Sequence, residues 1–121
     1  MDEITILQAA ILKTIASPRR LEILHVLAAG PIEVGRLAAV IGATQPNVSQ
    51  QLAVLRAAGV VEAERDGREV RYRLSDADVM VACGVMRSVL ERRLTRLGEL
   101  AANAAAGAAT PSAAPASVST R

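Results

Sequence analysis

The chain has 121 residues, of which 51% are hydrophobic, and a formal net charge of +2 at pH 7; these values predict one folded domain, and such a charge does not by itself indicate a nucleic-acid partner. Tyr72 is the single aromatic residue, so we expect a core of Leu, Ile, Val and Ala in a mainly α protein. The one cysteine, Cys83, excludes an intrachain disulfide and a multi-thiolate metal site within one chain, which is typical of a cytoplasmic protein.

Two helices are predicted near the beginning of the chain. Apolar residues recur every three or four positions over residues 4–15, which is the period of one helix face. A second helix is expected over residues 18–29, because Ser17 can cap it, Pro18 suits its first position and Gly30 begins a stop signal. This region has no basic leader and no apolar run long enough to cross a bilayer, so we expect neither export nor a membrane partner.

A pair of short helices follows. Residues 33–42 have an apolar face that ends at Gly42, and Gly is the usual residue after a helix. Thr44 can cap the next helix, which is expected to run to about Ala58 and to stop at Gly59. Two short helices joined by a tight turn predict a helix-turn-helix.

The apolar period then changes to two. Apolar and charged residues alternate over residues 61–74 around Asp66-Gly67, which predicts a β-hairpin. A helix-turn-helix followed by a hairpin is the arrangement of a winged helix.

A long last helix is predicted to end near Leu100. Ser75 and Asp78 resemble a capping box at its start, and its apolar stripe consists of Val79, Cys83, Met86, Leu90, Leu94 and Leu97. Residues 101–121 are rich in Ala, Ser and Pro and lack large apolar side chains, which predicts a disordered tail. The expected organisation is therefore a folded domain over residues 1–100 and a tail over residues 101–121.

The second helix of the helix-turn-helix has an unusual outer face. Val48, Leu52 and Leu55 share its core side. The outward residues are Gln45, Ser49, Gln50, Ala53 and Arg56. Short side chains allow close approach to a groove floor, Gln can pair with adenine, and Arg can reach guanine or phosphate. This face predicts binding to the DNA major groove.

The hairpin supports the same interpretation. Its arginines, Arg65, Arg68, Arg71 and Arg73, flank the tight turn, where they can contact phosphates or the minor groove. The alternative is that they pair with the hairpin glutamates on a solvated surface. The residues assigned to DNA contact are Thr44, Gln45, Asn47, Ser49, Gln50, Arg56, Arg65, Arg68 and Arg71.

Three stretches together resemble the ArsR/SmtB family of bacterial winged-helix repressors: SPRRLEILHVL, QPNVSQQLAVLRAAGVV and ERDGREVRYRLSD. The resemblance covers about residues 4–100. It implies a homodimer whose first and last helices form the subunit contact, and which binds a double-stranded, near-palindromic operator until an inducer arrives. Gln51 stands where many members have His, a departure that bears on operator contacts rather than on the fold.

The apolar stripes also favour a dimer without reference to the family. The stripes of the first and last helices are too long to be covered by a small helix-turn-helix unit, and a two-fold dimer covers both. The alternative is that each stripe packs within its own chain.

Two metal sites that are familiar in this family are not intact in this sequence. The third predicted helix lacks a Cys-x-Cys pair, and Val89 and Arg92 stand at the spacing of the later ligands of a last-helix site. We therefore expect no metal at either site and no cofactor. A noncanonical site at the dimer interface is the alternative; its ligands would be drawn from His25, Cys83, Asp76 and Asp78. Cys83 is expected to be a buried, inert thiol, with redox sensing as its functional alternative.

No residue set predicts an enzyme, because the acids are scattered and no nucleophile or phosphate-binding loop is evident. The main prediction is an operator-binding repressor that is released by an inducer. A winged-helix module for protein contacts is the alternative, and a small-molecule-binding protein is a third. The polar outer face favours the first, because a protein-interaction surface would carry large apolar residues there.

Overall fold

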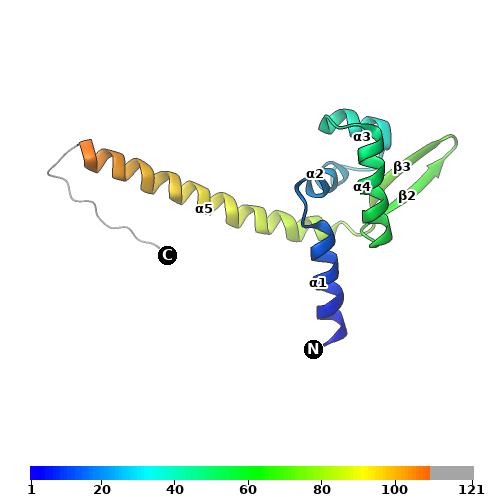
Figure 1. Ribbon diagram of the computed structural model, residues 1–121, viewed down its shortest axis with the longest axis horizontal. Coiled ribbons are helices and arrows are strands. Elements are labelled where there is room, and N and C mark those ends of the chain that lie inside the picture. Colours follow the sequence, from blue (N-terminus) through cyan, green and yellow to red (C-terminus); the bar gives the residue numbers. More distant parts are fainter. Residues whose placement is uncertain (110–121) are drawn as a thin grey trace. The chain divides into compact units, whose positions relative to one another are not determined.

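The computed structural model describes residues 1–109 (Figure 1). In chain order its elements are α1 (Glu3–Ile15), α2 (Pro18–Leu27), β1 (Ile32–Glu33), α3 (Val34–Ile41), α4 (Gln45–Ala57), β2 (Val61–Asp66), β3 (Glu69–Leu74) and α5 (Asp78–Ala109). The contacts divide the described residues into two compact units, the second of which begins at Val81. The predicted mainly α architecture with a hairpin wing is confirmed.

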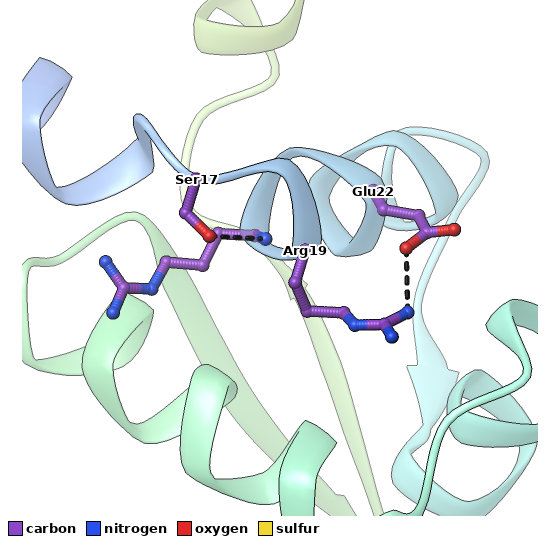
Figure 2. Close-up of polar contacts among 4 residues, drawn as sticks. Ser17, Arg19 and Glu22 are labelled. Atoms are coloured by element: carbon purple, nitrogen blue, oxygen red, sulfur yellow. Dashed lines mark hydrogen bonds and ion pairs between the residues drawn. The ribbon is translucent and has the colours of Figure 1, made fainter.

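The helix starts follow the predicted capping residues. Ser17 Oγ accepts a hydrogen bond from the Arg20 backbone N–H at 3.4 Å (Figure 2), and Thr44 Oγ1 caps α4 by accepting from the backbone N–H three residues on, at 3.3 Å. Asp2 caps α1, and hydrogen bonds from the Thr5 side chain and backbone lower the pKa of its carboxyl. Each cap satisfies an N–H group that has no partner inside its helix.

The core of the first unit is aliphatic, as the composition predicts. Helices α2, α3 and α4 pack on one another, and α2 and α4 also pack on the sheet. The buried side chains are Ile15, Ile23, Leu24, Leu27, Leu37, Ala38, Val48, Leu52, Leu55, Val60 and Val61. Burial is therefore concentrated where α2, α3 and α4 pack together, with Val60 and Val61 added from the beginning of β2.

The sheet has one strand more than the sequence indicated. Its order is β1-β3-β2, and both pairings are antiparallel. Strand β1 has two residues, with Ile32 opposite Tyr72 and Glu33 opposite Arg71. A two-residue strand has no alternation to detect, and it forms here because the chain that leaves Gly30 runs along the free edge of β3.

Helix α5 differs from its prediction at both ends. Asp76, rather than Ser75, caps it: the Asp78 N–H donates to Asp76 Oδ1 at 2.9 Å, and the Ser75 hydroxyl is buried without a partner among the described residues. The helix also continues to Ala109 instead of ending near Leu100. Residues 101–109 are mostly alanine, the strongest helix former, so a sequence without large apolar residues still propagates an existing helix. The rest of the predicted tail, residues 110–121, lies outside the described residues.

Candidate nucleic-acid interface

Helices α3 and α4 form the predicted helix-turn-helix (Figure 1). Gly42 ends α3 in the left-handed conformation with φ of 73°, which Gly adopts at little cost. The backbone N–H of Ala43 then donates to the Ala38 carbonyl at 3.0 Å. This closes the turn directly before the Thr44 cap and sets the direction in which α4 leaves α3.

The first turns of α3 and α4 approach each other at Gly35. The Gly35 N–H donates to Glu33 Oε1 at 2.9 Å, and this bond caps α3. A Cβ at residue 35 would lie 3.0 Å from Glu33 Oε1 and 3.3 Å from Gln45 Oε1. Glycine therefore permits the Gln45 side chain to lie over the start of α3, so Gln45 is exposed but directed toward a neighbouring helix.

Helix α4 has two chemically opposite faces. Val48, Leu52 and Leu55 have exposed fractions of 0%, which confirms the predicted core side. The residues predicted to face outward, Gln45, Ser49, Gln50, Ala53 and Arg56, are all exposed, as is Asn47. The inner face anchors the helix, so the outer face is presented on a rigid support.

The arginines on one face of the hairpin are paired within the hairpin. Arg73 Nη2 lies 2.8 Å from Glu62 Oε1, and Arg73 Nε lies 3.3 Å from Glu64 Oε2. Arg71 Nη2 lies 3.3 Å from Glu69 Oε1. The register places Glu62 opposite Arg73 and Glu64 opposite Arg71, so opposite charges meet across the strands. Arg71 and Arg73 thus take part in ion pairs on an exposed surface, which is the arrangement that the alternative interpretation describes.

The arginines nearest the tip of the hairpin have no such partners. Asp66 pairs with Glu69 across a two-residue loop, in which Gly67 has φ of 67° and Arg68 follows it. A glycine with positive φ at the first loop position is typical of a type II′ turn, whose twist matches that of the strands. Within residues 1–109, no carboxylate lies at ion-pair distance from Arg65 or Arg68. The tip thus holds two arginines that form no ion pair among the described residues, together with the carboxylates of Asp66 and Glu69.

One polar contact at this site was not predicted. Arg20 on α2 donates from Nε to Gln51 Oε1 on α4 at 2.9 Å and from Nη1 to the Thr14 carbonyl oxygen on α1 at 2.7 Å. Arg20 and Gln51 are separated by 31 residues, so no local pattern links them. The one sequence feature that points to this contact is the position of Gln51 on α4, beside the face that is buried.

Cys83 lies on α5 and is half-buried. Within residues 1–109, no group of three or more His, Cys, Asp or Glu side chains is arranged to hold a metal ion. In the same range, no helix has the length and hydropathy needed to span a membrane.

Comparison with known proteins places these features in a family. The arsR family of bacterial regulatory proteins matches residues 17–63, which contain α2, the helix-turn-helix and the beginning of the wing. The HTH-type transcriptional regulator Rv0081 of Mycobacterium tuberculosis is 42% identical over 106 residues, which are 86% of this chain and 93% of that protein.

Solved structures agree. The crystal structure of Rv0081 matches with a TM-score of 0.68 and 40% identity over 78% of this chain and 96% of that chain. The homodimeric winged helix-turn-helix DNA-binding domain Mb0332 of Mycobacterium bovis matches with a TM-score of 0.69 and 32% sequence identity. The match covers 75% of this chain and 84% of that chain. The transcriptional repressor BigR of Xylella fastidiosa matches with a TM-score of 0.61 and 34% sequence identity. The match covers 74% of this chain and 96% of that chain. This chain therefore belongs to the arsR family of bacterial transcriptional regulators, and its fold is the winged helix-turn-helix.

Proposed function

We propose that the protein is a homodimeric repressor that reads an operator with α4 and holds the DNA backbone with the tip of its wing. The observation that carries the proposal is the division of α4 into a fully buried aliphatic face and an exposed face of small and polar side chains. Ser49 and Gln50 lie at the middle of the exposed face. Side chains of this size enter a major groove and hydrogen-bond to base edges.

The same face argues against a protein-interaction module. The centre of a protein interface is usually aromatic or large and aliphatic, and is depleted of small polar groups. On α4 the exposed large aliphatic residue is Val54, with an exposed fraction of 38%. The unpaired cations Arg65 and Arg68 on the wing instead match a polyanion.

The proposed dimer accounts for apolar side chains that remain exposed in the single chain. On α1 they are Ile4, Ile6, Leu7 and Leu12, and on α5 they are Val81, Val85, Met86, Val89, Leu90, Leu94 and Leu97. Monomers rarely expose so many large apolar side chains along a helix. The similar domain Mb0332 is a homodimer, which supports a homodimer here; the assignment of the contact to α1 and α5 rests on their exposed apolar side chains.

An inducer is part of the proposal. Neither of the two familiar metal sites of the family is intact in this sequence, so we propose that release depends on a different signal. Cys83 is the one thiol in the chain and lies among the exposed apolar residues of α5, where oxidation would disturb the proposed dimer contact. Such a regulator acts in the cytoplasm, beside the DNA.

The test of DNA reading starts from a duplex selected by the parent protein from a random pool. Replacing Ser49 or Gln50 with Ala is expected to lower the ratio of its affinities for the selected and a scrambled duplex, because each good base contact contributes about 1–3 kcal/mol. Fluorescence anisotropy with both duplexes measures this ratio. If no duplex is enriched, the proposed function is wrong; an unchanged ratio in both variants would instead remove the assignment to this face of α4.

The wing makes a second prediction with a built-in control. Replacing Arg68 with Ala is expected to weaken binding to the selected and the scrambled duplex alike, and to lower the slope of log affinity against log salt by about one for each protomer on the DNA. Replacing Arg73 with Ala removes the same charge from a residue already paired with Glu62 and Glu64, and should change the slope less. The measurement is anisotropy over a series of salt concentrations. Equal slopes in the Arg68 variant and the parent would show that the wing tip does not contact phosphate.

A further inference from the structure

The Arg20 side chain joins three helices at one point. Its Nε–H donates to Gln51 Oε1 on α4 at 2.9 Å, and its Nη1 donates to the Thr14 carbonyl oxygen in the last turn of α1 at 2.7 Å. Both bonds are partly buried, and both are shorter than the usual N–H···O distance or equal to it. Hydrogen bonds from a charged donor are stronger than those between neutral groups.

The geometry of Arg20 makes this link directional. A guanidinium is planar and presents its donors in a rigid fork, so the acceptor on α1 and the acceptor on α4 are held at a fixed relative angle. The backbone of Arg20 lies in the first turn of α2, where its N–H donates to the Ser17 cap at 3.4 Å (Figure 2). The Arg20 guanidinium is therefore attached to the beginning of a capped helix.

The bond also decides what Gln51 does. Glutamine reads adenine with its carbonyl oxygen and its amide nitrogen together. In this protein Oε1 of Gln51 already accepts from Arg20, and the side chain is half-buried while its neighbour Gln50 is exposed. Gln51 is thus directed toward α2, and it anchors α4 from the side that the buried leucines do not cover.

We propose that Arg20 is a positioning residue for DNA reading, which holds α4 in register with α1 and α2 through the Gln51 carboxamide. The inference rests on the proposed function, and it adds that Arg20 and Gln51 act as one unit without touching a base. Helix α1 belongs to the proposed dimer contact, so the link sets the orientation of each reading helix relative to the subunit interface. A small rotation of α4 separates its polar face from the base edges but leaves the wing on the phosphates.

The test measures the affinity ratio for a duplex selected by the parent and its scrambled form. The variants are Arg20→Met, Gln51→Leu, the double variant and Gln51→Glu. The matched control is Arg19→Met, which removes an adjacent arginine of the same charge. Arg19 Nη1 lies 2.8 Å from Glu22 Oε1 within α2 (Figure 2), so its ion pair joins no second helix, although Arg19 lines the same open cavity as Asn47 and Gln51.

Arg20→Met and Gln51→Leu are each expected to lower the ratio about tenfold, which corresponds to the loss of one good base contact. The double variant should lose about tenfold as well, because residues that act as one unit are not additive. Gln51→Glu keeps an acceptor oxygen for Arg20, so its ratio should stay within about threefold of the parent, although its negative charge weakens binding to both duplexes. Arg19→Met should weaken both duplexes alike, with a ratio also within about threefold of the parent.

Several results would overturn the inference. An unchanged ratio in Arg20→Met, an approximately hundredfold loss in the double variant, or equal losses in Gln51→Glu and Gln51→Leu would each show that the pair does not position α4. Circular dichroism melts establish that the variants are folded at the assay temperature. If Arg20→Met is unfolded there, the comparison of Gln51→Glu with Gln51→Leu decides alone. If the parent protein enriches no duplex, the proposed function is wrong, and so is this inference, which rests on it.

Discussion

Replacing Leu94 with Glu is expected to convert the protein from a dimer to a monomer at micromolar concentration. Leu94 lies on α5 with an exposed fraction of 68% in the single chain, within the surface proposed to form the subunit contact. Burying a leucine contributes about 1.5–3 kcal/mol, and a two-fold dimer contains the substitution twice. The dissociation constant should therefore rise at least about 100-fold, before the cost of burying a carboxylate is added.

Loss of the dimer should also weaken DNA binding. Two recognition helices on one dimer reach half-sites about one helical turn apart, and a monomer loses the advantage of having the second helix already in place. Affinity for the selected duplex should fall by at least about 100-fold. Sedimentation velocity over a range of concentrations measures the assembly, and anisotropy measures the DNA affinity.

The control for this variant is the same substitution at the next residue. Thr95 belongs to the polar face of α5, where it lies beside Glu91 and Arg92. Thr95→Glu adds the same charge without entering the apolar stripe, so it should remain dimeric. A stable Leu94→Glu dimer with undiminished operator affinity would contradict the proposed role of α5.

Replacing Leu52 with Ala is expected to cause the largest loss of stability among the α4 variants. The Leu52 side chain is fully buried on the inner face of α4, with Val48 one turn before it. Removal of its isopropyl group leaves a cavity in a closely packed core, and such changes lower the free energy of unfolding by about 2–5 kcal/mol. Urea denaturation followed by circular dichroism measures this loss. Protein concentrations must be equal, because unfolding of a dimer depends on concentration.

A substitution on the opposite face of the same helix supplies the comparison. Gln50 is exposed, so Gln50→Ala should change the free energy of unfolding by no more than about 0.5 kcal/mol. The same variant is expected to have a lower ratio of affinities for the selected and the scrambled duplex. Its effect on DNA recognition is thus distinguished from an effect on stability. A loss below about 1 kcal/mol in Leu52→Ala would mean that the inner face of α4 is not the rigid support described above.

The sequence by itself determined the helix-turn-helix and the wing. Ser17 and Thr44 act as the caps that their positions predict, and the two-residue period of the hairpin is reproduced in its register. The inner and outer faces of α4 also follow from residue spacing. These features are local: a cap acts within one turn, and the period of apolar residues decides which face can be buried. The prediction that α5 ends near Leu100 is wrong, because alanine's helix propensity continues the helix to Ala109 without large apolar residues.

Only the tertiary structure decided which polar groups meet. It paired Arg71 and Arg73 with glutamates and left the tip arginines without ion-pair partners among the described residues, although all four arginines look alike in the sequence. It added β1 to the edge of β3 and brought Arg20 to Gln51 and to the end of α1. A hydrogen bond between distant segments depends on distances within a few tenths of an ångström. Those distances are set by how the helices pack, and no periodicity along the chain encodes them.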